Sequence, residues 1–134
     1  MNDLLSAAHL AVVSLSGGAG CALRVVVRDA LARRGSHPWW STWFVNLSGA
    51  FAMGLVAGSA SGASPALGHA STTVLAGLLA GWTTYSAFSM DVVQLWLRGA
   101  RVHACGLWAA TLAGAPAAAL AGGAIARTAI GGAT

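Results

Sequence analysis

Three long stretches without a single Asp, Glu, Lys or Arg make up most of this chain. They cover residues 4–23, 35–90 and 102–126. A helix needs about 20 predominantly apolar residues to cross the hydrocarbon core of a bilayer, so the outer stretches can each cross once and the middle one twice. The sequence therefore predicts an all-α membrane protein, residues 1–134 forming a single domain of four transmembrane helices. The spans are expected at about 4–31, 39–60, 69–97 and 102–126.

The composition agrees with a membrane-embedded chain. Hydrophobic residues account for 57% and charged residues for 7%, whereas about a quarter of the residues of a soluble domain are charged. The net charge of +4 does not indicate a nucleic-acid partner, because the arginines lie between apolar runs, as membrane flanks do. The start, Met1-Asn2-Asp3, lacks the positive charge of a cleaved signal peptide, so the first span is expected to remain.

The arginines are distributed unequally between the two predicted sides of the membrane. Four spans place the 1–2 and 3–4 connections on one side, where five arginines lie, and Arg127 on the other. The five are Arg28, Arg33, Arg34, Arg98 and Arg101. By the positive-inside rule both termini are expected outside.

A polar cluster in the second span includes Asn46 and Thr42, which are four residues apart and share a helical face. Buried polar groups in a bilayer must face protein or a water-filled path. Asn46 can therefore form an interhelical hydrogen bond that holds the bundle together. Alternatively it can line a pore, where its two N–H donors would suit an anion.

The third span contains the sequence GWTTYSAFS at residues 81–89, which is rich in hydroxyl groups. One interpretation is a continuous helix whose hydroxyls bond back to the preceding turn. The other is a helix broken near its middle, whose unwound carbonyls can coordinate a cation. Arg24, near the end of the first span, is either functional or snorkels to a lipid headgroup. The chain has no carboxylate pair, no nucleophile–base spacing and no histidine cluster, so an enzyme is not expected.

Three stretches together carry a family resemblance. They are GGAGCALR at 17–24, TWFVNLSGAFAMG at 42–54 and GWTTYSAFSMD at 81–91. In this order and spacing, within four predicted spans, they resemble the Fluc/CrcB family of small bacterial fluoride channels. The resemblance implies a channel that lets fluoride leave the cytoplasm across the bacterial plasma (inner) membrane.

The resemblance also implies an assembly and a set of sites. It implies an antiparallel dimer with two fluoride pathways and a structural sodium ion at its centre. Arg24 would attract anions in the vestibule, and the main-chain carbonyls of Ala80 and Thr83 would bind the sodium. The fluoride pathway would be lined by Asn46, Tyr85, Phe88, Thr42, Ser86 and Thr111.

The chain departs from the family pattern at three positions. Tyr85 replaces a phenylalanine, Ala80 replaces a glycine and Asp91 replaces a glutamate. The arginine asymmetry is a further departure, because a homodimer of opposed subunits requires a chain that inserts both ways. A heterodimer with an oppositely oriented homologue is therefore expected in preference to a homodimer.

Two other function classes fit a small four-span chain. A proton-coupled small multidrug-type exporter needs an acid inside the membrane. The chain has no glutamate, and Asp91 lies close to the end of its span. A non-transporting membrane assembly protein would use Asn46 and the hydroxyl groups only to hold helices together.

Overall fold

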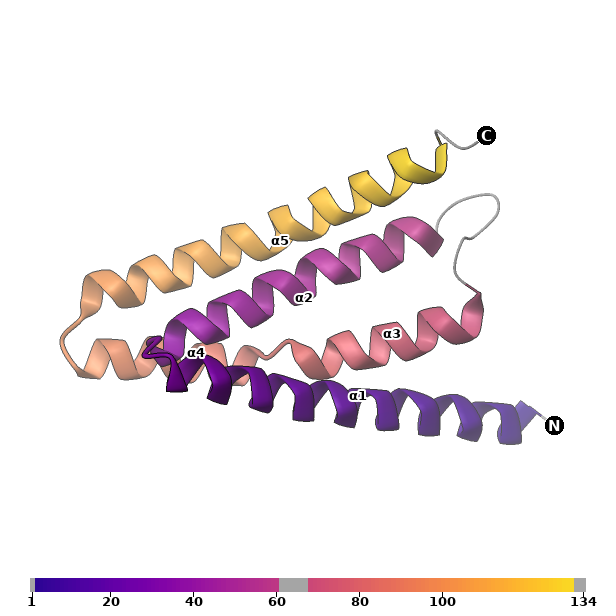
Figure 1. Ribbon diagram of the computed structural model, residues 1–134, viewed down its shortest axis with the longest axis horizontal. Coiled ribbons are helices and arrows are strands. Elements are labelled where there is room, and N and C mark those ends of the chain that lie inside the picture. The colour runs from indigo at the N-terminus through magenta and orange to yellow at the C-terminus, as the bar shows by residue number, and fades with distance from the viewer. Residues whose placement is uncertain (1, 61–67, 132–134) are drawn as a thin grey trace.

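The computed structural model describes the backbone of residues 2–60 and 68–131, and within this part every regular element is an α-helix (Figure 1). The helices are α1 (Asn2–Arg33), α2 (Pro38–Ala60), α3 (His69–Trp82), α4 (Tyr85–Leu97) and α5 (Arg101–Gly131). The expected all-helical class is confirmed. By length and composition, three helices of the described chain could cross a membrane, within Ala7–Arg33, Pro38–Ala60 and Arg101–Ala129.

The predicted third span corresponds to α3 and α4, which have 14 and 13 residues. Thr83 and Thr84 separate them and have extended backbone angles, with ψ values of 152° and 117°. The last helical hydrogen bond of α3 runs from the N–H of Thr83, the residue that follows the helix, to Leu79 O at 3.0 Å. The helical hydrogen-bond ladder is therefore interrupted between Trp82 and Tyr85.

The α1–α2 and α4–α5 turns lie at one end of the molecule, and the N- and C-termini lie at the other (Figure 1). Each turn has a glycine with positive φ, 80° at Gly35 and 79° at Gly99. Ser36 N donates to Leu31 O, and Ala100 N donates to Leu95 O. These bonds close both helices with Schellman caps, for which a residue without a Cβ is preferred.

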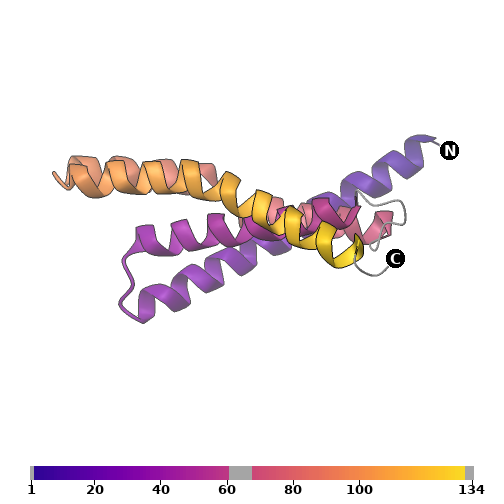
Figure 2. The same ribbon diagram turned by 90° about the horizontal axis from the view of Figure 1, so that it is seen from above.

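The helices pack most closely in two pairs, α2 with α5 and α1 with α3. Glycines allow the backbones to approach in each pair. A Cβ at Gly81 would meet the carbonyl of Gly17, and a Cβ at Gly54 would meet the carbonyl of Ala119. Toward the turn end, the start of α5 and the end of α1 splay apart (Figure 2). At that end the start of α5 lies beside α4, and the end of α1 lies beside the start of α2.

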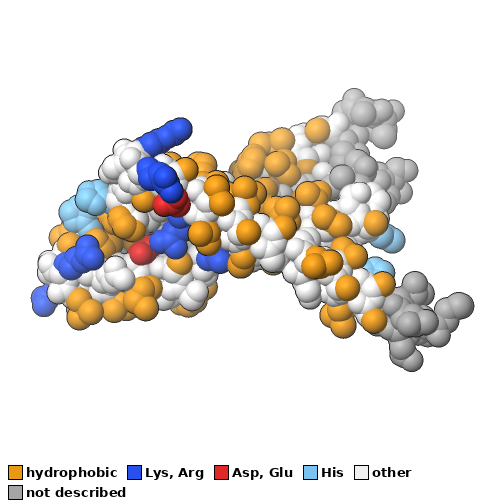
Figure 3. All heavy atoms as spheres, turned by 60° about the horizontal axis from the view of Figure 1, so that its bottom comes forward, with side chains coloured by type: hydrophobic (Ala, Val, Ile, Leu, Met, Phe, Trp, Pro, Cys, Tyr) orange, Lys and Arg blue, Asp and Glu red, His pale blue; other side chains and the backbone are white. Residues whose placement is uncertain are grey.

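Large apolar side chains are exposed along the length of the helices. They include Leu15 at 77%, Leu120 at 71% and Val102 at 85% exposure. On the face that Figure 3 shows, the arginine side chains gather toward the end that carries the two short turns, whereas Arg127 lies near the far end of α5. An apolar outer surface whose charges lie mostly at one end is the surface of a multi-pass membrane protein.

Candidate functional site

The side chain of Asn46 on α2 bonds to the backbone between α3 and α4. Its Nδ2 donates to Thr84 O at 3.1 Å, and its Oδ1 accepts from Thr84 N at 2.8 Å. Asn46 is 9% exposed, so the pair is shielded from solvent. The amide thus satisfies both polar groups of one extended peptide residue, and one of its two N–H donors is used in doing so.

This pairing changes which backbone groups are bonded at the interruption. In a continuous helix the carbonyl of Ala80 would accept from Thr84 N, and the carbonyl of Thr83 from Ala87 N. Thr84 N donates to Asn46 instead, and Ala87 N donates to Thr84 Oγ1 at 3.3 Å. The carbonyls of Ala80 and Thr83 are thereby left without the amides that would pair with them in a helix.

A second contact holds the same segment of α2 against the end of α3. Trp82 Nε1 donates to Ser48 Oγ at 3.1 Å. A Cβ at Gly49 would come within 2.8 Å of Trp82 Cδ1 and would also meet the Thr83 side chain. Asn46, Ser48 and Gly49 therefore form one docking surface for residues 82–84.

Beside this junction lies an open groove of about 360 Å³ between α2, α4 and α5. Its wall includes the aromatic pair Tyr85 and Phe88, whose ring centroids are 5.8 Å apart at an interplanar angle of 56°. Phe88 is 3% exposed, whereas Tyr85 is 77% exposed. The remaining lining residues are Asn46, Ala50, Thr83, Thr84, Thr111, Leu112, Ala115 and Pro116. All the side chains of this groove are uncharged.

The α5 wall of the groove carries a hydroxyl group that has no partner. Thr111 Oγ1 is buried and makes no hydrogen bond within the described part of the chain. Pro116 lies five residues beyond, inside α5. Asn46 on α2 and Thr111 on α5 thus both line the groove, and the Thr111 hydroxyl forms no hydrogen bond within the described residues.

The structure thus brings five predicted residues to one place: Asn46, Thr83, Tyr85, Phe88 and Thr111 line the same groove. Ala80 precedes it on α3. Three other predicted residues, Thr42, Ser86 and Arg24, are not among the residues that line the groove.

Thr42 is fully buried, and its Oγ1 donates to Pro38 O at 3.3 Å, inside its own helix. Ser86 is exposed beside the groove, and its Oγ lies 3.2 Å from Thr84 Oγ1. Arg24 on α1 donates through Nη2 to Cys21 Sγ at 3.1 Å, and its buried Nε has no partner within the described residues.

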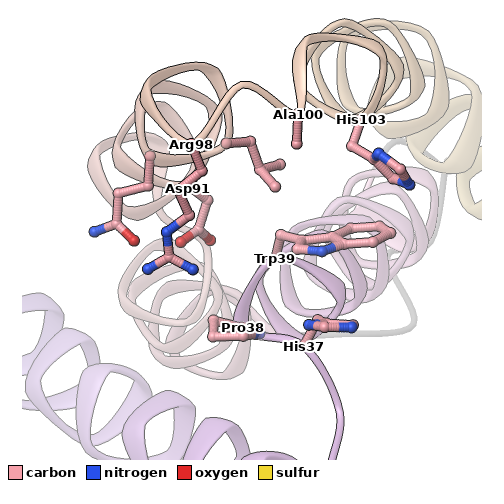
Figure 4. A pocket seen from close by; sticks show the side chains of 9 residues that line it. His37, Pro38, Trp39, Asp91, Arg98, Ala100 and His103 are labelled. Atoms are coloured by element: carbon pink, nitrogen blue, oxygen red, sulfur yellow. The ribbon is translucent and has the colours of Figure 1, made fainter.

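A separate pocket of about 340 Å³ lies at the turn end of the bundle. Asp91 and Arg98 project from α4 on one side of it, and Trp39 lies between His37 and His103 on the other (Figure 4). The ring centroids of these histidines are 6.3 and 6.2 Å from that of Trp39. Asp91 is 8% exposed, and its Oδ2 has no hydrogen-bond partner in the described chain.

Comparison with known proteins gives a consistent set of relatives. The family described as CrcB-like protein, Camphor Resistance (CrcB), matches residues 11–128. A fluoride-specific ion channel FluC of Chelativorans sp. (strain BNC1) is 37% identical over 107 residues, which are 79% of this chain and 86% of the relative.

The fluoride-specific ion channel FluC of Rhodopseudomonas palustris (strain BisB5) is 37% identical over 112 residues, which are 83% of this chain and 87% of the relative. The FluC of Hyphomonas neptunium (strain ATCC 15444) is 40% identical over 103 residues, which are 73% of this chain and 78% of the relative. This chain belongs to the CrcB family. No solved structure is a significant match to it.

The matched region of this CrcB chain includes every residue that lines the groove and the end pocket. Two hydrogen bonds of this site had no signal in the sequence. The Asn46–Thr84 pair joins residues 38 positions apart, and Trp82–Ser48 joins residues 34 positions apart. Which helix faces meet decides such contacts, and in a nearly uniformly apolar chain the hydrophobic pattern does not mark those faces.

Proposed function

We propose that this CrcB chain is a fluoride channel subunit. The observation that supports this most directly is the groove, where the Asn46 amide, the Thr111 hydroxyl and the Tyr85–Phe88 ring pair meet without a charged side chain. The relatives, which are named fluoride-specific ion channels, align over most of the chain. Outward passage of fluoride would lower its concentration in the cytoplasm.

The chemistry of the groove suits a small, strongly hydrated anion. Such an ion needs polar groups that replace its water. The second N–H of Asn46 and the Thr111 hydroxyl are hydrogen-bond donors, and aromatic rings present a positive edge. The bond from Asn46 to Thr84 fixes the plane of the amide, so the remaining N–H has a defined direction. These donors would take the place of part of the hydration shell.

We infer that α3 and α4 together make the third membrane crossing, interrupted at Thr83 and Thr84. At about 1.5 Å per residue, each is about 20 Å long and too short for a core of about 30 Å. Together with α1, α2 and α5 they would give four crossings, in the bacterial plasma membrane. With the two arginine-bearing turns in the cytoplasm, both termini would lie outside.

The proposed assembly is an antiparallel dimer. The groove is open on one side, and Tyr85 stands 77% exposed at its edge, which supports closure of the path by a second subunit. The arginine asymmetry favours an oppositely oriented homologue as partner. A homodimer is the alternative.

A structural sodium ion is proposed at the α3–α4 junction. The carbonyls of Ala80 and Thr83 suit it, because their helical amide partners donate elsewhere and because hard cations prefer oxygen ligands. The ion would supply positive charge that compensates the unpaired carbonyls. Asn46 and Trp82 would hold the two helix ends in place for it.

The decisive experiment is efflux from proteoliposomes, followed with a fluoride electrode. The chain is assayed alone and after co-expression with an oppositely oriented homologue. Efflux of chloride and efflux of a cationic drug are measured as controls. Fluoride efflux that exceeds chloride efflux supports the channel. If fluoride stays inside under both conditions, the channel proposal fails. Full activity of the chain alone would support the homodimer.

One observation favours a second candidate function. Asp91 is buried, its Oδ2 has no hydrogen-bond partner within the described residues, and it lies in the pocket that contains Trp39; a proton-coupled multidrug-type exporter needs an acid inside the membrane. If the second candidate is right, the cationic drug moves with a proton gradient and Asp91→Asn abolishes its transport. If the channel is right, fluoride moves without a proton gradient.

A further inference from the structure

We propose that the end pocket binds the headgroup of one phosphatidylethanolamine molecule and that an adjoining groove holds one of its acyl chains. This tryptophan groove measures about 260 Å³ and lies between Trp39, Trp40 and Trp43 on α2 and the first turns of α5. Trp39 and His103 line both cavities, so the two adjoin. Neither cavity shares a lining residue with the Asn46 groove. The lipid site is therefore separate from the proposed fluoride path.

The tryptophan groove is apolar and belongs to the surface that a membrane-embedded chain turns to lipid. Trp40 and Val102, on its two walls, are 50% and 85% exposed. Nothing lies within 4 Å of a Cβ built at Gly106, which also lines the groove. Tryptophan side chains are enriched where the hydrocarbon core meets the headgroups. The groove therefore lies at the depth where an acyl chain joins its headgroup.

The end pocket carries charges of both signs that are not paired with each other. Asp91 is 8% exposed, and its Oδ2 has no hydrogen-bond partner within the described residues. Arg98 projects into the same pocket from the same helix (Figure 4). In the described chain these two side chains form no ion pair. A buried carboxylate without a donor is costly, so the pocket suits a ligand that brings a cation to Asp91 and an anion to Arg98.

A phosphoethanolamine headgroup has these two charges next to each other. Its ammonium would donate to the Asp91 carboxylate, and its phosphate would accept from the Arg98 guanidinium, which are both charge-assisted hydrogen bonds. His37 and His103 lie on either side of Trp39 in the pocket (Figure 4). Each has a ring N–H that can also donate to a phosphate. The pocket thus offers donors for the anion and an acceptor for the cation.

Other phospholipid headgroups fit these charges less well. A headgroup with only negative charge, such as that of phosphatidylglycerol, would meet the carboxylate of Asp91. A choline headgroup could contact the Trp39 ring through a cation–π interaction, but its methylated nitrogen has no N–H to donate to Asp91. The buried carboxylate therefore selects a primary ammonium.

Native mass spectrometry of the purified protein, with lipids added in non-denaturing detergent, tests the headgroup. We expect phosphatidylethanolamine to bind about tenfold more tightly than phosphatidylcholine with the same acyl chains, because methylation removes the hydrogen bond to a charged group. Asp91→Asn should abolish this preference. Asp29→Asn is the matched control, because Asp29 is exposed and pairs with Arg33 outside the pocket, and it should keep the preference. Equal binding of the two lipids by the wild type, or tighter binding of phosphatidylglycerol, would overturn the headgroup assignment.

The acyl-chain part of the site is tested by filling the tryptophan groove. Gly106→Leu places a side chain where a Cβ meets nothing within 4 Å, so the helices need not move. It should weaken the binding of both lipids about tenfold, the loss expected when about two methylene groups leave the groove. Gly18→Leu adds the same side chain on α1, also where a Cβ meets nothing, and should bind lipid as the wild type does. Unchanged binding in Gly106→Leu would refute the groove as the acyl-chain site.

These measurements do not depend on fluoride flux. A protein that binds phosphatidylethanolamine selectively but conducts no fluoride supports the lipid site and refutes only the channel. A protein that conducts fluoride but does not distinguish the lipids supports the channel and refutes only the lipid site.

Discussion

The side-chain amide of Asn46 bonds to the backbone of Thr84 in both directions, donating at 3.1 Å and accepting at 2.8 Å. A side chain on α2 thereby takes the place of the helical neighbours that Thr84 would have in an unbroken helix. The same two bonds fix the orientation of the amide toward the groove. Structural support for the junction and the donor that we propose for the ion path thus come from one residue.

Asn46 therefore supports a prediction that separates its two roles. Asn46→Ala and Asn46→Asp both lose the bond to the Thr84 carbonyl, but only Asp adds a negative charge. A carboxylate beside the path repels an anion strongly in surroundings of low dielectric constant, so we expect Asn46→Asp to slow fluoride efflux about a hundredfold more than Asn46→Ala, which corresponds to about 2.7 kcal/mol in the barrier. Efflux from proteoliposomes gives the comparison. Equal losses in the two variants would remove Asn46 from the ion path and leave it a structural role.

The bond between Trp82 and Ser48 should contribute to stability. Trp82→Phe and Ser48→Ala each remove one partner, and interhelical hydrogen bonds in membranes contribute about 0.6–2 kcal/mol. We expect each change to lower the free energy of unfolding by about this amount, and the double variant to lower it no further than the larger single effect. Unfolding by denaturing detergent provides the measurement. Additive losses would show that the bond is not formed.

The close packing of α1 against α3 predicts a contrast between two neighbouring glycines. A Cβ at Gly20 would meet the backbone of Leu78 and come within 3.0 Å of Trp82 N, whereas nothing lies within 4 Å of a Cβ at Gly18. Gly20→Ala should destabilise the protein by about 1–3 kcal/mol because the helices must separate. Gly18→Ala, the matched control, should be neutral or slightly stabilising because alanine favours a helix. Thermal unfolding in detergent measures both, and similar melting temperatures would contradict the packing.

Removal of sodium tests the ion proposed at Ala80 and Thr83. A ligand that binds only the folded state stabilises it by about 1.4 kcal/mol per tenfold rise in concentration above its dissociation constant. The melting temperature should therefore rise with sodium chloride and change less with potassium chloride at equal ionic strength. Identical curves in the two salts would exclude a sodium-specific site. This readout does not depend on fluoride flux.

Much of the fold could be predicted because its signals are local. The charge-free runs locate the helices, and the glycines in Arg33-Arg34-Gly35 and Arg98-Gly99 mark turns that have positive φ in the structure. The polar residues of the junction were also recognisable, since hydroxyl and amide groups are rare in apolar segments. The sequence did not reveal how these groups are paired.

The pairing depends on how each helix is rotated about its axis. Thr42 shares a face with Asn46 in the sequence pattern, but it is fully buried and bonds within α2. Ser86 bonds back to Thr84. A hydroxyl group can be satisfied by its own helix or by a neighbour, and the sequence does not distinguish the two. The predicted vestibule role of Arg24 stays a prediction, and so do the predicted pathway roles of Thr42, Asn46, Tyr85, Ser86, Phe88 and Thr111.

The contact of residues 46, 48 and 49 with residues 82–84 constrains which substitutions the two segments can accept. Two segments more than thirty positions apart are fitted to one another by hydrogen bonds and by a missing Cβ. A chimera that takes one segment from a relative and keeps the other would mismatch at this joint, whereas a chimera that exchanges both would not. We therefore expect amino-acid substitutions in one segment to be accompanied by substitutions in the other among related proteins.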